Sequence, residues 1–200
     1  LGDCLERMKE IESGSVDMIL TDPPYGTTAC KWDSIVPLEP MWEQLKRIIK
    51  PNGAIVMTAS QPFTTTLISS NMKMFKYCWL WQKQRPSNFF QAKFAPLNQM
   101  EDICIFSFGG CNNGAKNPMS YNPQGTIKIN ESRGNSNTGG GVGINKGCQK
   151  LSGKSYTAKT KNYPKTLLSY PVDNKGLHPT QKPVALMEYL IKTYTNECET

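Results

Sequence analysis

Residues 21–26 read TDPPYG and directly follow the mostly apolar run VDMIL at 16–20. A proline pair and a glycine cannot continue a helix or a central strand. An apolar run that stops at such a turn is typical of a buried strand, so the sequence predicts a strand over 16–20 that ends in a rigid bend. The bend places one carboxylate, Asp22, and one aromatic ring, Tyr25, at the carboxyl end of that strand.

The sequence on either side alternates between helix and strand patterns. Apolar residues recur at helical spacing over 38–49, and the tetrapeptide KPNG at 50–53 is a typical helix end. Shorter apolar and aromatic runs without that spacing predict strands. This alternation predicts an α/β fold with a mostly parallel sheet that is covered on both faces. We expect helices over 38–49, 62–70 and 183–194 and strands over 16–20, 54–59, 75–81 and 103–108.

Residues 109–170 differ in composition from the rest of the chain. They hold eleven of the 16 glycines, nine of the 23 lysines and arginines and a single acidic residue, Glu131, so their side chains carry a net charge of +8. The remainder is close to neutral, at −1. A basic, glycine-rich insertion on a neutral scaffold suits contact with nucleic-acid phosphates; the alternative is a solvated flexible insertion. The stretch TGGGVG at 138–143 has no strand pattern before it and no helix pattern after it, so we interpret it as a loop.

Composition argues against several other classes of protein. Seven cysteines form no Cys-x-x-Cys pair and the only histidine is His178, which predicts neither a metal site nor a disulfide framework. No apolar segment is long enough to span a bilayer, and the first residues lack the pattern of a signal peptide, so we expect a cytoplasmic protein without a membrane partner. The net charge of +7 and pI near 9.0 favour a negatively charged partner.

The bend has the chemistry needed to hold the amino group of a nucleobase. Such an amine is a poor nucleophile because its lone pair is delocalised into the ring, and acceptors directed at both of its hydrogens favour tetrahedral geometry. Asp22 offers a carboxylate, and Pro23 offers a carbonyl whose direction is restricted by the two proline rings. Tyr25 offers a flat surface for stacking. The alternative interpretation is a tight turn with an incidental aspartate.

Two motifs resemble those of a known enzyme family. Asp22-Pro23-Pro24-Tyr25 resembles the catalytic motif of the amino-methylating DNA methyltransferases, which use S-adenosylmethionine to methylate adenine N6 or cytosine N4. The segment HPTQKP at 178–183 resembles the one by which the β-group of these enzymes holds the methionine part of the cofactor. The resemblance implies an incomplete Rossmann-like S-adenosylmethionine-dependent methyltransferase sheet with a basic target-recognition insertion.

The same resemblance assigns functions to individual residues. The catalytic residues would be Asp22, Pro23, Pro24 and Tyr25. The stretch LGDCLE at 1–6 is similar to the family's lead-in to the catalytic strand, although Asp3 equally suits a helix N-cap. Residues 79–83 and Asn88 would fall where the family has a strand and a loop beside the target base. The cofactor would contact Asp3, Asp22, His178, Thr180, Gln181 and Lys182, where polar groups at a helix N-terminus can meet a carboxylate.

The order of the segments also matches the β-group. It predicts a first catalytic part over 1–108, a target-recognition insertion over 109–170 and a cofactor-methionine segment with its helix over 171–200. The family's glycine-rich cofactor loop does not follow before Thr200, so we expect these residues to be part of a longer protein. Double-stranded DNA is the expected partner, through the insertion residues Lys116, Lys128, Arg133, Lys146, Lys150 and Lys154.

Several alternatives remain open from the sequence alone. Aspartate in the first motif position resembles the adenine-N6 subgroup more than the cytosine-N4 subgroup, which more often has serine there. Methylation of RNA or of protein glutamine is a rival, although the glutamine enzymes carry asparagine in place of Asp22 and need no large basic insertion. A second rival is a DNA-binding protein without turnover. The sequence predicts neither the recognised DNA sequence, nor an accompanying restriction nuclease, nor the oligomeric state.

Overall fold

The computed structural model describes residues 2–28, 30, 33–133, 156–172 and 180–200. The chain divides into two compact units. The first consists of Leu1–Asn122 and Lys165–Thr200, and the second of Pro123–Pro164. The second unit lies within the predicted insertion and is shorter than it, since residues 109–122 and 165–170 belong to the first unit.

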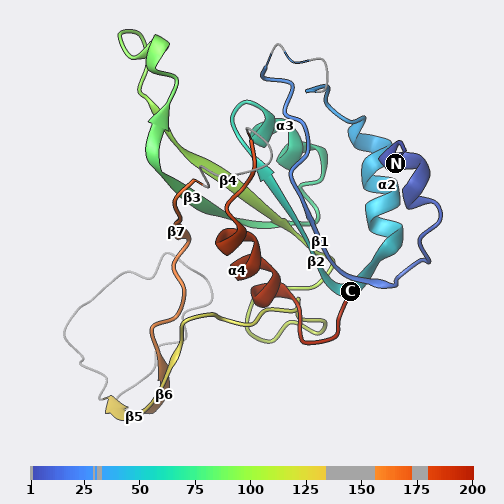
Figure 1. Ribbon diagram of the computed structural model, residues 1–200. Helices are drawn as coiled ribbons and strands as arrows, with labels where there is room; N and C mark the ends of the chain where they lie inside the picture. The colour runs from blue at the N-terminus through green and yellow to red at the C-terminus, as the bar shows by residue number, and fades with distance from the viewer. Residues whose placement is uncertain (1, 29, 31–32, 134–155, 173–179) are drawn as a thin grey trace. The chain divides into compact units, whose positions relative to one another are not determined.

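A five-stranded sheet forms the centre of the first unit (Figure 1). The strand order is β1 (Val16–Thr21), β2 (Ile49–Ala59), β4 (Asn98–Phe106), β3 (Phe75–Ser87) and β7 (Leu167–Ser169). β1 pairs in parallel with β2, and β3 pairs in parallel with β7, whereas β4 is antiparallel to both β2 and β3. The α/β class is confirmed, but the sheet is mixed, which corrects the expected mostly parallel sheet.

β4 runs opposite to its neighbours β2 and β3 because of the connection that precedes it. β3 and β4 are joined by residues 88–97, whose only helical element is the short 3-10 turn η1 (Phe89–Gln91). A connection without a crossover helix returns the chain antiparallel to the strand that it leaves. The sequence pattern identified both strands, but the parallel expectation assumed a crossover between them.

Helices cover both faces of the sheet, as predicted. Successive residues of β2 point to opposite faces. Ile55 and Met57 pack in one buried cluster with residues of α2 (Leu38–Ile48) and α3 (Phe63–Ser70), such as Trp42 and Leu67. Val56 packs in the other cluster with residues of α4 (Val184–Tyr194), such as Leu190. All three predicted helices are present, and their observed bounds agree with the predicted ones within one residue.

Strand β3 contributes two buried indoles to the α4 side. Trp79 and Trp81 are 3% and 2% exposed, so both aromatic side chains belong to the core. Trp79 Nε1 donates to the Tyr194 hydroxyl at 2.7 Å, and Trp81 Nε1 donates to the carbonyl of Tyr170 at 3.0 Å. These bonds fix α4 and the segment after β7 against β3, and both segments lead into the site described below.

Some elements were not predicted. The short strand β7 and the helix α1 (Cys4–Met8) carry too few residues for a periodic pattern. The second unit contains an antiparallel pair, β5 (Ile127–Arg133) and β6 (Tyr156–Lys161), where the sequence suggested loop. The TGGGVG stretch at 138–143 lies outside the described residues. Within the described part of the chain, no helix has the length and apolar character needed to cross a membrane.

Candidate active site

The TDPPYG bend lies at the carboxyl end of β1 and borders a cavity of about 530 Å³ in the first unit. Gly26 turns the chain away with φ +66°, and a Cβ atom there would lie 2.9 Å from the Ile35 side chain. Glycine is therefore required at this position for both conformation and space. The cavity is lined by Asp22, Pro23, Pro24, Tyr25, Thr27, Thr28, Asp33, Trp81, Lys83, Glu101, Val172, Thr180, Gln181 and Lys182.

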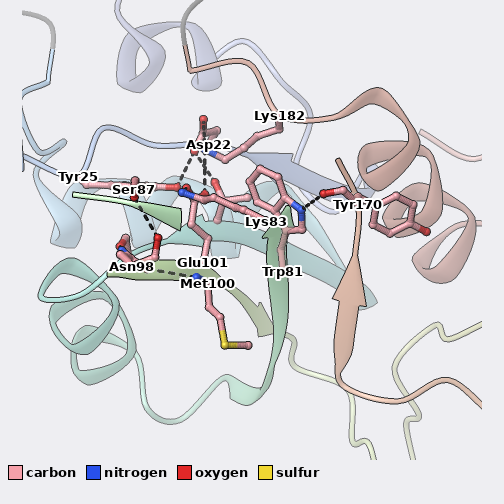
Figure 2. Close-up of polar contacts among 12 residues, drawn as sticks. Asp22, Tyr25, Trp81, Lys83, Ser87, Asn98, Met100, Glu101, Tyr170 and Lys182 are labelled. Carbon is pink, nitrogen blue, oxygen red and sulfur yellow. Dashed lines mark hydrogen bonds and ion pairs between the residues drawn. The ribbon is translucent and has the colours of Figure 1, made fainter. Parts of the chain in front are cut away.

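Both carboxylate oxygens of Asp22 accept hydrogen bonds (Figure 2). Oδ1 accepts from the Tyr25 hydroxyl at 2.8 Å and from the Thr58 hydroxyl on β2. Oδ2 accepts from the Lys182 ammonium at 3.0 Å. The carboxylate is thus oriented by two neutral donors on one oxygen and by one cation on the other, and its side chain remains 37% exposed to the cavity.

The Tyr25 ring is fixed on several sides. It stacks on Phe63 with the ring centroids 5.4 Å apart and the planes 20° apart, and Lys182 Nζ lies over the ring at 5.5 Å from its centroid. Burial raises the pKa of Tyr25 far above its usual value, and the neighbouring Asp22 carboxylate raises it further. The phenol therefore keeps its proton and remains a donor to Asp22.

Lys182 connects Asp22 to a second, more deeply buried ion pair. Its ammonium lies 3.3 Å from Glu101 Oε2, while the other oxygen of Glu101 binds Lys83. The three side chains are 10%, 12% and 15% exposed. Glu101 Oε2 is buried and accepts no hydrogen bond from the described residues, because the contact with Lys182 lacks hydrogen-bond geometry. The site thus holds two carboxylates and two ammonium groups in one connected row.

A third carboxylate, that of Asp33, shapes the loop that follows the bend. Asp33 Oδ1 accepts from the Gly26 N–H at 2.9 Å, and Oδ2 accepts from the N–H groups of Thr27 and Thr28 at 2.9 and 2.7 Å. A hydrogen bond from the Thr28 side chain, together with these backbone donors, lowers the pKa of Asp33 to about 2. Asp33 therefore holds three consecutive backbone donors in place at the rim of the cavity.

This arrangement predicts a specific pH dependence of stability. Because the pKa of Asp33 in the folded chain is about 2, below the ordinary value of 3.8, its stabilising contribution is complete above about pH 4 and is lost as pH falls through about 2. We expect Asp33→Asn to lower the free energy of unfolding at neutral pH, and the difference from wild type to vanish near pH 2. Denaturant titrations at several pH values measure this difference. A difference that stays constant down to pH 2 would contradict the role of the ionised carboxylate.

The structure brings together most of the residues predicted for the site. The four motif residues 22–25 and the segment 180–182 line the same cavity, although they are about 160 positions apart. His178 lies outside the described residues. Asp3 does not line the cavity; its carboxylate accepts from Leu5 N at 2.8 Å and caps α1, which agrees with the alternative interpretation. The cofactor contacts of Asp3 and His178 stay predictions.

The predicted DNA-binding residues are only partly described. Lys116 is exposed in the first unit, and Lys128 is exposed on β5 in the second. Arg133 ends β5. Lys146, Lys150 and Lys154 lie outside the described residues.

Four polar residues of the site were not predicted individually: Thr58, Lys83, Glu101 and Asp33. Of these, only Lys83 lies in a stretch, 79–83, to which the resemblance gave a place near the target base. The first three lie on strands β2, β3 and β4, and Asp33 lies in the loop after the bend. The available signal was weak: Lys83 and Glu101 are charged residues next to strongly apolar strand segments. Such residues are buried only when they are paired, which the structure shows here.

Comparisons with known proteins identify the family to which this chain belongs. The sequence model of a family described as DNA methylase, covering N6 and N4 enzymes, matches residues 16–200. The type II methyltransferase M.HpaI of Haemophilus parainfluenzae is 22% identical over 207 residues, which cover 98% of this chain and 59% of M.HpaI. The chain thus spans about three-fifths of that relative's length.

Solved structures show the same fold. The match to the M1.HpyAVI–SAM complex has a TM-score of 0.55 at 20% sequence identity. It covers 99% of this chain and 77% of the M1.HpyAVI chain. The match to the cytosine-N4-specific PvuII DNA methyltransferase has a TM-score of 0.63 at 12% sequence identity. It covers 100% of this chain and 70% of the PvuII enzyme's chain. The mixed sheet described above is therefore similar to the sheets of these enzymes.

Proposed function

The chain belongs to the N6/N4 DNA methylase family. We propose that it forms the catalytic and target-recognition part of a DNA methyltransferase, which transfers the methyl group of S-adenosylmethionine to the amine of a base extruded from duplex DNA. The observation that carries this proposal is the cavity in which residues 22–25 meet residues 180–182. A single small molecule in this cavity can contact the Asp22 carboxylate, the Pro23 carbonyl and the Tyr25 ring. The proposed base is adenine, methylated at N6.

The cavity fits the cofactor that the family implies. Its volume of about 530 Å³ is within the range of small-molecule sites, and its wall combines aromatic faces with polar groups. Thr180 and Gln181 would hold the cofactor's carboxylate just before α4, as the resemblance implies, with Lys182 adding positive charge. When bound, the cofactor supplies an electrophilic methyl group.

The residues of the bend act on the base. Asp22 and the Pro23 carbonyl accept the two N–H groups of the amine, which withdraws its lone pair from the ring and directs it for an in-line attack. Tyr25 holds the plane of the base. As the nitrogen–carbon bond forms, the bond between sulfur and the methyl carbon would break, and its electron pair would remain on sulfur in the S-adenosylhomocysteine product. The Asp22 carboxylate stabilises the positive charge that develops on the nitrogen, and the methylated amine then loses one proton to solvent. A covalent enzyme intermediate is not required.

The test of this function is direct. The complete gene product that carries these residues is incubated with unmodified genomic DNA and S-adenosylmethionine labelled in its methyl group. The DNA is then hydrolysed, and its nucleosides are identified by mass spectrometry. N6-methyldeoxyadenosine is the expected product. N4-methyldeoxycytidine would assign the other subgroup, and DNA binding without transfer would favour a binding protein.

A second surface of the first unit supports DNA as the partner. The connection 88–97 carries three phenylalanines, Phe89, Phe90 and Phe94, which are 64%, 100% and 89% exposed. Residues 71–100 contain no acidic residue, and Arg85 and Lys93 are exposed among them. Strand β3 runs from the cavity-lining Lys83 to this tip over six residues, roughly 20 Å at the usual strand rise. An exposed aromatic tip with positive charge, roughly 20 Å from the site, suits contact with the duplex that flanks an extruded base.

We therefore expect Phe90→Ala/Phe94→Ala to weaken binding to a mixed-sequence duplex by about tenfold, as for the loss of aromatic–base contacts. The salt dependence of binding should not change, because no charge is removed. Fluorescence anisotropy at several salt concentrations measures both quantities. Met72→Ala, which removes another exposed apolar side chain, is the matched control. Equal affinities of the double variant and the wild type would exclude the tip from the DNA interface.

A further inference from the structure

Three of the about four acceptor positions of the Asp22 carboxylate are occupied by side chains of the site. Oδ1 accepts hydrogen bonds from the hydroxyl groups of Tyr25 and Thr58, and Oδ2 accepts one from the Lys182 ammonium. The remaining position, on Oδ2, lies beside the Lys182 ammonium, whose charge opposes the positive charge that develops on the amine, so one of the three donors must move for Asp22 to stabilise that charge fully. The identity of the donor that leaves determines what else the site must provide.

Lys182 is the donor most easily displaced. Thr58 is 1% exposed on the central strand β2, and the Tyr25 ring is stacked on Phe63 after two prolines. Neither hydroxyl can move without moving the core or the bend. The lysine side chain has four rotatable bonds, and its ammonium can shift while its backbone stays in place.

A displaced Lys182 ammonium needs another partner within the cavity wall. Its side chain is only 10% exposed, and a buried cation without a partner carries a large desolvation penalty. Glu101 Oε2 lies 3.3 Å from Lys182 Nζ, is buried and accepts no hydrogen bond from the described residues. The other oxygen of Glu101 is held by Lys83, which fixes the direction of the carboxylate. One acceptor is thus left unused directly beside the cation that must move.

We propose that Glu101 is a positioning residue that takes over Lys182 when the amine of the base binds Asp22. This rests on the proposed function and adds a role for a strand residue that the motifs do not include. In the ligand-free chain, Lys182 bridges the two carboxylates and neutralises Asp22. When the base enters, Lys182 leaves Asp22 and stays paired with Glu101, and the negative charge of Asp22 is directed at the amine on which positive charge develops.

Glu101→Gln tests this exchange in the complete gene product. The amide keeps the shape of the side chain but removes its charge, so Lys182 is retained by Asp22 and competes with the base. We expect kcat for methyl transfer to genomic DNA to fall by about 10- to 100-fold, with the KM for the cofactor and for DNA within about twofold of wild type. Glu101→Asp keeps the charge and should recover at least a third of the wild-type kcat. Asp17→Asn, which breaks the ion pair between the buried Asp17 and the half-exposed Lys50 outside the cavity, is the control and should keep the wild-type kcat.

The outcomes separate this inference from the proposed function. A wild-type protein that transfers no methyl group overturns both. An active wild type with an equally active Glu101→Gln variant overturns only the role of Glu101. If Glu101→Gln lowers the melting temperature and kcat and raises KM together, and Glu101→Asp does not recover them, then Glu101 only supports the fold. That result would also overturn the inference.

Discussion

Asp22→Asn is expected to lower the rate of methyl transfer by about 10²- to 10³-fold, and Asp22→Ala to abolish measurable transfer. The carboxylate is oriented by Tyr25, Thr58 and Lys182, so it is fixed before a base arrives. An amide in its place would present a donor to the amine on one side and would lose the negative charge. The loss should appear in kcat, because the interaction strengthens as positive charge develops on the nitrogen.

Binding measurements distinguish this effect from a loss of folding. Cofactor affinity, measured by isothermal titration, should change by less than about tenfold in Asp22→Asn, because Thr180 and Gln181 remain in the cavity wall. Asp17→Asn again serves as the control, since Asp17 lies on β1, the strand that leads into the bend, and is 8% exposed but does not line the cavity. An Asp22→Asn variant with more than a tenth of wild-type kcat would remove the carboxylate from the catalytic step.

The part of the site that the sequence predicted has local causes. The bend at 22–26 is determined by its prolines and glycine, and the segment 180–183 precedes a helix whose apolar spacing is regular. Such features depend on neighbouring residues, so a pattern within a few positions identifies them. The prediction that these two segments meet came from the family resemblance, and the ion pair between Lys182 and Asp22 agrees with it.

The missed residues depend on pairing over longer distances. Glu101 faces Trp81 because β3 and β4 pair in one particular register, and that register depends on the shape of the connection 88–97. Asp33 reaches back to three N–H groups across a loop without a periodic pattern. The mixed sheet has the same origin, since a missing crossover helix reverses β4. Local propensities contain none of this information.

Tyr25→Ala is expected to reduce kcat/KM for DNA by about 10²-fold, whereas Tyr25→Phe should keep transfer within about tenfold of wild type. Stacking of a base on an aromatic ring contributes roughly 1–3 kcal/mol, and alanine loses that surface together with the contact to Phe63. Phenylalanine keeps the surface and loses only the 2.8 Å hydrogen bond to Asp22, whose Oδ1 still accepts from Thr58. Steady-state assays on genomic DNA measure the two ratios.

The same pair of variants distinguishes stacking from proton chemistry at Tyr25. Burial and the Asp22 carboxylate keep the phenol protonated, so its hydroxyl can donate but cannot act as a base near neutral pH. The Tyr25→Phe variant should therefore show the same pH dependence of kcat as the wild type between pH 6 and 9. If Tyr25→Phe is as inactive as Tyr25→Ala, the hydroxyl and not the ring is the functional group, and the base must be held by another surface of the cavity.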